Sequence, residues 1–141
     1  MKSDTYYMNI ALKLAKKANE LNEIPVGAVV VDSLGNILGK GYNKKEKTNK
    51  AIAHAEIEAI TKANKKINNW RLIDCTLYVT LEPCEMCKNV IKESRIKKII
   101  YCQSNNSKIV DQYYSKQIDN SNLIKEYNGI FRDSFNKIRW D

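Results

Sequence analysis

Apolar residues near the start of the chain recur with the spacing of an amphipathic helix. Between about residues 5 and 21 they fall three and four positions apart and therefore share one helix face. These residues are Ile10, Leu14, Ala18 and Leu21. Pro25 ends that pattern, and a β-branched run, VGAVVVD, is then separated by the turn SLGN from a second strand-like segment, ILGKGYN. The pattern predicts a helix followed by an antiparallel β-hairpin.

The middle of the chain alternates between helix and strand patterns. AHAEIEAITKANKK is typical of a helix, and CTLYVTL is typical of a strand that is buried on both faces. CEMCKNVIKESR indicates a further helix and KKIIYC a fourth strand. Pro83 stands at the start of that further helix, where its missing N–H costs nothing.

The pattern is weaker after Cys102. LIKEY is predicted as a short fifth strand and GIFRDSFNKIRW as a C-terminal helix. Strands that alternate with helices after an opening hairpin favour a mixed sheet between two helical layers. No internal repeat or linker divides the sequence. We therefore expect residues 1–141 to form a three-layer α/β/α single domain, with a mixed sheet of about five strands opening with an antiparallel hairpin.

The composition is that of a globular protein, with 43% hydrophobic and 28% charged residues. The first segment is polar and rich in lysine, unlike a secretion signal, and no apolar run approaches the roughly 20 residues that span a membrane. We therefore expect a cytoplasmic protein with no membrane contact. In a reducing compartment, the cysteines are expected to be metal ligands, catalytic thiols or core residues rather than disulfides. They are Cys75, Cys84, Cys87 and Cys102.

The formal net charge of +8 would attract phosphate groups and so favours a nucleic-acid partner. However, 20 of the 24 basic residues are lysine. That bias, together with abundant Asn and Ile, is also what an A+T-rich genome produces without selection for binding. Five of the lysines lie in KGYNKKEKTNK at residues 40–50, beside one glutamate. This segment is a candidate RNA contact, although charge alone leaves the partner open.

Cys84 and Cys87 form a Cys-x-x-Cys pair directly after Pro83. Redox-active dithiols, half zinc sites and chance matches all share this pattern, and its place after a strand also suits a thioredoxin-like protein. His54, the one histidine of the chain, begins a predicted helix, with Glu56 two residues later. Taken alone, a histidine there is more often a surface or core residue, and acidic residues are common in a first helical turn because they suit the helix dipole.

Taken together, the two segments predict a catalytic metal site. The imidazole of His54 and the thiolates of Cys84 and Cys87 supply three protein ligands for one Zn²⁺ per chain, and the fourth tetrahedral position stays open to water. Helix N-termini favour negative charge and so suit both thiolates. Glu56 is too close to His54 in sequence to be a convenient ligand, but its carboxylate could move protons to and from water that zinc activates.

His-x-Glu followed by Pro-Cys-x-x-Cys resembles the signature of the zinc-dependent nucleobase deaminase superfamily, here as HAE at residues 54–56 and PCEMC at residues 83–87. The flanking segments also resemble the bacterial tRNA-specific adenosine deaminases over roughly residues 23–101. These segments are EIPVGAVVV, GYN, AHAEI, NWRL, LYVTLEPCEMC and SRI. The resemblance implies a cytidine deaminase-like fold, a homodimer, and hydrolytic deamination of adenosine to inosine at the anticodon wobble position of tRNA.

The resemblance also implies roles for individual residues. The three ligands named above would bind zinc, and Glu56 would move protons. Asn43 would contact the nucleobase or ribose of the tRNA anticodon stem-loop, while Val26 and Ala28 would form part of the base pocket. From the residues alone, Asn43 could equally be a turn residue after a strand, and Val26 and Ala28 could be ordinary strand core.

Three departures from this family bear on the substrate. The family usually carries Asp-Pro-Thr before AHAE, where this chain has NKAI at residues 49–52. The loop CQSNNSKIVDQYYSKQ lacks the family's acidic, glycine-containing character, and the C-terminal helix is expected to be short beside the family's. These departures leave a free nucleobase or nucleoside deaminase for guanine or cytosine open as an alternative. A third hypothesis is a non-enzymatic, zinc-stabilised RNA-binding module, although such a module would not need Glu56.

Overall fold

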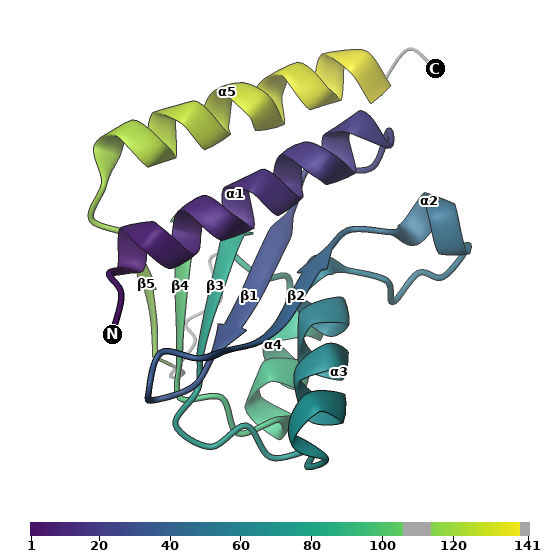
Figure 1. Cartoon of the computed structure of the whole chain (residues 1–141). Coiled ribbons are helices and arrows are strands. Elements are labelled where there is room, and N and C mark those ends of the chain that lie inside the picture. The colour runs from purple at the N-terminus through teal and green to yellow at the C-terminus, as the bar shows by residue number, and fades with distance from the viewer. Residues whose placement is uncertain (106–113, 139–141) are drawn as a thin grey trace.

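The computed structural model describes residues 1–105 and 114–138 of the chain. Its elements follow one another as helix, hairpin and then alternating helices and strands (Figure 1). In chain order they are α1 (Asp4–Glu20), β1 (Gly27–Val31), β2 (Ile37–Tyr42), α2 (Lys45–Thr48), α3 (Ala55–Ile67), β3 (Thr76–Leu81), α4 (Glu85–Glu93), β4 (Lys98–Gln103), β5 (Ser115–Gln117) and α5 (Ser121–Ile138).

The five strands form one mixed sheet in the order β2-β1-β3-β4-β5 (Figure 1). β1 is antiparallel to β2 and β3, whereas β4 is parallel to β3 and β5. This confirms the predicted sheet and its opening hairpin. Because β1 runs against its neighbours, its first residue lies at the same edge as the last residues of β2 and β3: Gly27 pairs with Tyr42, and Ala28 pairs with Val79. The segments that enter or leave the sheet at this edge build the site described below.

Helices cover both faces of the sheet, which confirms the three-layer architecture (Figure 1). On one face α1 and α5 bury a core that includes Tyr7 and Tyr127. On the other face α3 and α4 bury a core that includes Ile60 and Ile91. Within the described part of the chain, no helix is both long enough and apolar enough to cross a membrane.

The C-terminal part of the chain differs from the sequence-based prediction. LIKEY is not a strand, because residues 123–127 lie within α5, which has 18 residues and begins before the predicted GIFRDSFNKIRW helix. The fifth strand is β5, which pairs with β4. The helix starts early because Asn120 Oδ1 accepts a hydrogen bond from the Leu123 backbone N–H at 3.1 Å, as an N-cap does, and because Leu123 and Tyr127 are buried one turn apart. Residues 106–113 of the divergent loop lie outside the described residues.

Two glycines in β2 let α3 pack closely against the sheet. A Cβ atom at Gly39 would overlap the carbonyl oxygen of Ala59 and lie 2.8 Å from the nitrogen of Ala63. A Cβ atom at Gly41 would overlap the carbonyl oxygen of Ala55. The three alanines are fully buried, so α3 meets the strand almost backbone to backbone. This contact fixes the N-terminus of α3, where His54 and Glu56 lie, against the sheet edge.

We expect Gly39→Ala to lower the free energy of unfolding by about 3 kcal/mol or more, because overpacking a core typically costs about 1–3 kcal/mol and the obstacle here is backbone that cannot rotate away. Urea unfolding followed by circular dichroism would measure the change. Gly129→Ala is the matched control. A Cβ there meets nothing within 4 Å, and replacing a helical glycine by alanine should raise the free energy of unfolding by up to about 1 kcal/mol. A Gly39→Ala protein within about 0.5 kcal/mol of wild type would contradict the close packing.

Candidate metal and catalytic site

Two helix N-termini meet at the site. His54 is the N-cap of α3 and Cys84 is the N-cap of α4, both with extended backbone and with no side-chain capping hydrogen bond. Ser, Thr, Asp and Asn usually hold this position because they satisfy the first free N–H groups. Here the two side chains point into the site instead, and Cys87, in the first turn of α4, joins them. Pro83 lies in the short connection between the end of β3 and the start of α4.

The three side chains are spaced as ligands of a single metal ion. His54 Nδ1 lies 3.4 Å from Cys87 Sγ and 3.9 Å from Cys84 Sγ, and all three ligand atoms lie within 4.8 Å of one another. Tetrahedral zinc, with Zn–S bonds of about 2.3 Å and Zn–N bonds of about 2.0–2.1 Å, would hold nitrogen and sulfur ligands about 3.6 Å apart. The residues present therefore fit one zinc ion, and no other such cluster occurs among the residues that the structure describes.

The other two cysteines take no part in this cluster. Cys75 and Cys102 are buried in the two cores, on either side of the sheet. Burial raises the pKa of Cys75 to about 11 and that of Cys102 to about 12. Both therefore stay neutral thiols at physiological pH, which assigns them to the last of the three predicted roles for the cysteines, that of core residues.

The two thiols of the site differ in their ionisation. A hydrogen bond from Cys87 lowers the pKa of Cys84 to about 5 even though burial opposes the shift, and the first N–H groups of α4 act in the same direction. The hydrogen bond with Cys84 and burial raise the pKa of Cys87. Without metal the pair thus shares one negative charge. A divalent cation would favour the thiolate form of both sulfurs.

Glu56 is a buried carboxylate next to the metal ligands. Its side chain is on the first turn of α3 and the residue is only 4% exposed. Burial raises the pKa of Glu56 to about 7 in the metal-free site, and the charge of Cys84 adds to the shift. A buried carboxylate that faces a pocket and titrates near neutrality suits a group that both accepts and donates protons.

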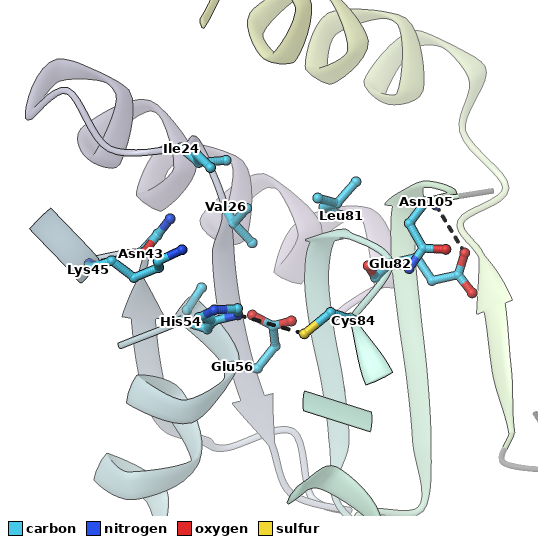
Figure 2. Close-up of a pocket in the computed structure, with 11 residues that line it drawn as sticks. Ile24, Val26, Asn43, Lys45, His54, Glu56, Leu81, Glu82, Cys84 and Asn105 are labelled. Atoms are coloured by element: carbon cyan, nitrogen blue, oxygen red, sulfur yellow. Dashed lines mark hydrogen bonds between the residues drawn. The ribbon is translucent and has the colours of Figure 1, made fainter. Parts of the chain in front are cut away.

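A cavity of about 180 Å³ opens above these residues. Figure 2 shows His54, Glu56 and Cys84 on its floor, with Asn43 on one side and Asn105 on the other. The complete lining is Ile24, Val26, Asn43, Lys45, His54, Ala55, Glu56, Leu81, Glu82, Cys84 and Asn105. The cavity is smaller than the roughly 300–1,000 Å³ of pockets for drug-sized ligands, so it suits one small heterocycle.

The residues predicted to contact substrate lie at different depths. Asn43 and Val26 line the cavity, whereas Ala28 does not and is fully buried in the core beneath α3. Asn43 Oδ1 accepts a hydrogen bond from the Lys45 backbone N–H at 3.2 Å. This contact engages the oxygen of the amide, so the group that Asn43 could offer to a substrate is its Nδ2 donor.

Several residues of the pocket wall had no signal in the sequence. Glu82 is the clearest: its carboxylate accepts hydrogen bonds from Ser104 Oγ at 3.0 Å and from the Asn105 N–H at 3.1 Å, and pairs with Lys88 Nζ at 3.2 Å. Asn105 Nδ2 in turn donates to the carbonyl of Pro83 at 3.0 Å. The start of the loop after β4 is thereby fastened beside the metal ligands. Only the position of Glu82 next to Pro-Cys-x-x-Cys could have indicated this role.

Comparisons with known proteins agree with this geometry. The family model of the cytidine and deoxycytidylate deaminase zinc-binding region matches residues 1–103. A tRNA-specific adenosine deaminase from Streptococcus pyogenes is 49% identical over 105 residues, which is 74% of this chain and 65% of that protein. The match thus spans slightly less than two thirds of the relative's own length.

Solved structures include two informative neighbours. One, from studies of A-to-I editing by tRNA deaminases at the wobble position of transfer RNA, has a TM-score of 0.73 at 30% identity and covers 81% of this chain and 98% of its own. The other, guanine deaminase from Bacillus subtilis, has a TM-score of 0.68 at 27% identity, and the match covers 94% of this chain and 95% of that protein. Because the family match includes all three ligands and Glu56, the chain belongs to the cytidine and deoxycytidylate deaminase zinc-binding family, and its metal is zinc.

Proposed function

We propose that the protein hydrolytically deaminates adenosine to inosine at the anticodon wobble position of tRNA and releases ammonia. The observation that carries the proposal is the buried carboxylate of Glu56 beside three converging zinc ligands on the floor of a cavity for one heterocycle. The relative from Streptococcus pyogenes supports tRNA as the substrate class.

The proposed roles follow from where the side chains lie. His54, Cys84 and Cys87 would hold zinc, whose chemistry here is to make water acidic enough to act as a nucleophile near neutral pH. Glu56 would take a proton from the attacking water, deliver it to ring nitrogen N1 of adenine, and pass the second water proton to the departing amine. A C6–O bond forms, the C6–N bond breaks and ammonia leaves. Asn43 Nδ2 would donate to the base or ribose.

The rim of the cavity suits an RNA loop from which one base is extruded. Lys45 lines the cavity, and Lys44 Nζ lies 4.7 Å from the centre of the Tyr42 ring at the end of β2. Ammonium groups at this edge would meet phosphates that flank the extruded adenosine. Val26 and Leu81 supply an apolar wall for the base.

We also propose the oligomeric state and the compartment of the enzyme. Residues 1–141 would form a single deaminase domain that works in the cytoplasm as a homodimer. The family resemblance supports the dimer, and the match to bacterial tRNA-modifying proteins supports the cytoplasm.

Inosine measured by mass spectrometry in unmodified tRNA, after incubation with zinc-loaded protein, tests the proposal. We expect inosine to form at the wobble position and not at other adenosines. The turnover at subsaturating tRNA should also fall steeply between about 50 and 200 mM salt, because each lysine–phosphate contact releases counterions from the RNA and added salt makes that release less favourable. Folded, zinc-loaded protein that forms no inosine would overturn the proposal.

A free-base deaminase is the second candidate, since the guanine deaminase neighbour covers nearly the whole chain, including the region after residue 103. Guanine and cytosine, incubated under the same conditions, would release ammonia only if this candidate holds. Its turnover should be nearly independent of salt, because an uncharged base makes no phosphate contacts.

A further inference from the structure

Glu23 is a buried carboxylate that the catalytic roles leave unexplained. It lies between α1 and β1 and is 2% exposed. A buried carboxylate is costly unless hydrogen bonds compensate for the lost water. Its two oxygens accept from two successive backbone N–H groups of α2: Glu23 Oε1 from Glu46 at 3.0 Å and Oε2 from Lys47 at 2.8 Å. The side chain therefore acts as a cap for a helix that lies more than 20 residues further along the chain.

α2 depends on this contact because little else holds it. It has four residues and buries none of them, and its N-cap, Lys44, makes no side-chain capping bond. A helix of one turn does not persist on its own in water. The N–H of Lys45 is satisfied by Asn43, and those of Glu46 and Lys47 by Glu23. Figure 1 shows α2 projecting beyond the sheet, between β2 and α3.

The same hydrogen bonds connect α2 to the cavity. Lys45 lines the cavity with its side chain and orients the Asn43 amide with its backbone N–H. If α2 shifted or unwound, the Asn43 oxygen would lose its donor, the amide could rotate, and Lys45 would leave the cavity. The zinc ligands and Glu56 lie at the N-termini of α3 and α4. The hydrogen bonds that Glu23 accepts from α2 do not involve these two helices.

We propose that Glu23 is a positioning residue for substrate binding: by capping α2 it holds the Asn43 amide and the lysines of α2 in place for RNA. This inference rests on the proposed function, because it assigns these groups to an RNA substrate. It predicts weaker binding of RNA with the chemical step intact.

The test compares Glu23→Gln with wild type in steady-state deamination of a tRNA anticodon stem-loop. Glutamine keeps the shape but replaces one acceptor oxygen by an NH₂ group that faces an N–H. We expect KM to rise about tenfold, as loss of a charge-assisted hydrogen bond allows, while kcat stays within about twofold and the zinc content is unchanged. Glu20→Gln makes the same charge change at an exposed residue of α1, and it should leave KM at the wild-type value.

Each outcome separates positioning from a merely structural role. If Glu23→Gln lowers the melting temperature but leaves KM unchanged, the inference is overturned while the proposed function stands. If wild type neither binds nor deaminates the stem-loop, the proposed function fails and the inference fails with it. If Glu23→Gln does not fold, Lys47→Pro and Lys47→Ala replace it: both lose the lysine charge, but only proline loses the N–H that Glu23 accepts. A KM at least threefold higher for Lys47→Pro supports the inference, and equal values overturn it.

Discussion

Replacing Glu56 by glutamine should reduce kcat/KM for tRNA at least about 1,000-fold while one zinc ion stays bound per chain. General acid–base groups contribute about 100- to 10,000-fold, and Glu56 is proposed to move both protons of the reaction. Glutamine has nearly the same volume, so the buried position accommodates it. It cannot accept and then donate a proton at neutral pH. Single-turnover formation of inosine, with zinc measured by elemental analysis on the same sample, gives both readouts.

Glu58→Gln is the matched control for this experiment. Glu58 is the second acidic residue in the first turn of α3 and does not line the cavity. Its replacement changes the charge and the helix dipole interaction equally, so activity should stay within about twofold of wild type, consistent with the small cost of losing a dipole contact at a partly exposed residue. Unchanged turnover in Glu56→Gln would remove Glu56 from the chemistry. RNA binding without turnover in wild type would favour the non-enzymatic module instead.

The core of the site could be predicted from sequence because its geometry is local. His54 and Glu56 sit within three residues, as do the two cysteines with Pro83 before them, and each set starts a helix. Helix N-termini are recognisable from composition and periodicity, and they point their first side chains in a known direction. Two short motifs therefore sufficed to predict the three ligands that the structure brings together.

The pocket wall could not be predicted in this way, because it depends on which strand ends share one edge of the sheet. Lys45, Glu82 and Asn105 come from three different connections and meet only through the strand order. Glu23 belongs to the same class, since its partners lie on a helix too short to leave a periodic pattern. The depth of Val26 and Ala28 depends in the same way on where β1 begins: Val26 lies just before the strand and lines the cavity, while Ala28 lies within the strand and is buried in the core.

The error at the C-terminus has a different origin. LIKEY contains β-branched and aromatic residues that favour a strand over five positions, but its apolar residues also fit one turn of a helix. A longer window, starting at the cap residue Asn120, includes Leu123, Tyr127 and Phe131 at a spacing of four. In the structure this spacing places Tyr127 in the core that α5 shares with α1, where its hydroxyl donates to the Pro25 carbonyl at 2.6 Å. Tertiary packing decided between two locally acceptable patterns.

Replacing Cys87 by alanine should release the zinc and abolish deamination. Cys87 is fully buried and its sulfur lies 3.4 Å from His54 Nδ1, so it is the inner of the two thiol ligands. Removing a group that only supports a ligand weakens metal binding by about 10- to 100-fold, so removing a ligand itself should weaken it by more than about 100-fold. Competition with a chromophoric chelator measures the affinity, and elemental analysis after dialysis measures the stoichiometry.

Cys75→Ala is the control that separates ligation from packing. It removes the same atom from another buried thiol in the core beneath α3, outside the metal cluster. Because burial raises the pKa of Cys75 to about 11, this thiol is neutral and contributes packing and a weak hydrogen bond to the Ile73 carbonyl at 3.7 Å. The variant should keep one zinc per chain and normal activity, with the loss confined to stability. Zinc retained with near wild-type affinity in Cys87→Ala would place the metal elsewhere, and wild-type protein without stoichiometric metal would return the Cys84–Cys87 pair to a redox role.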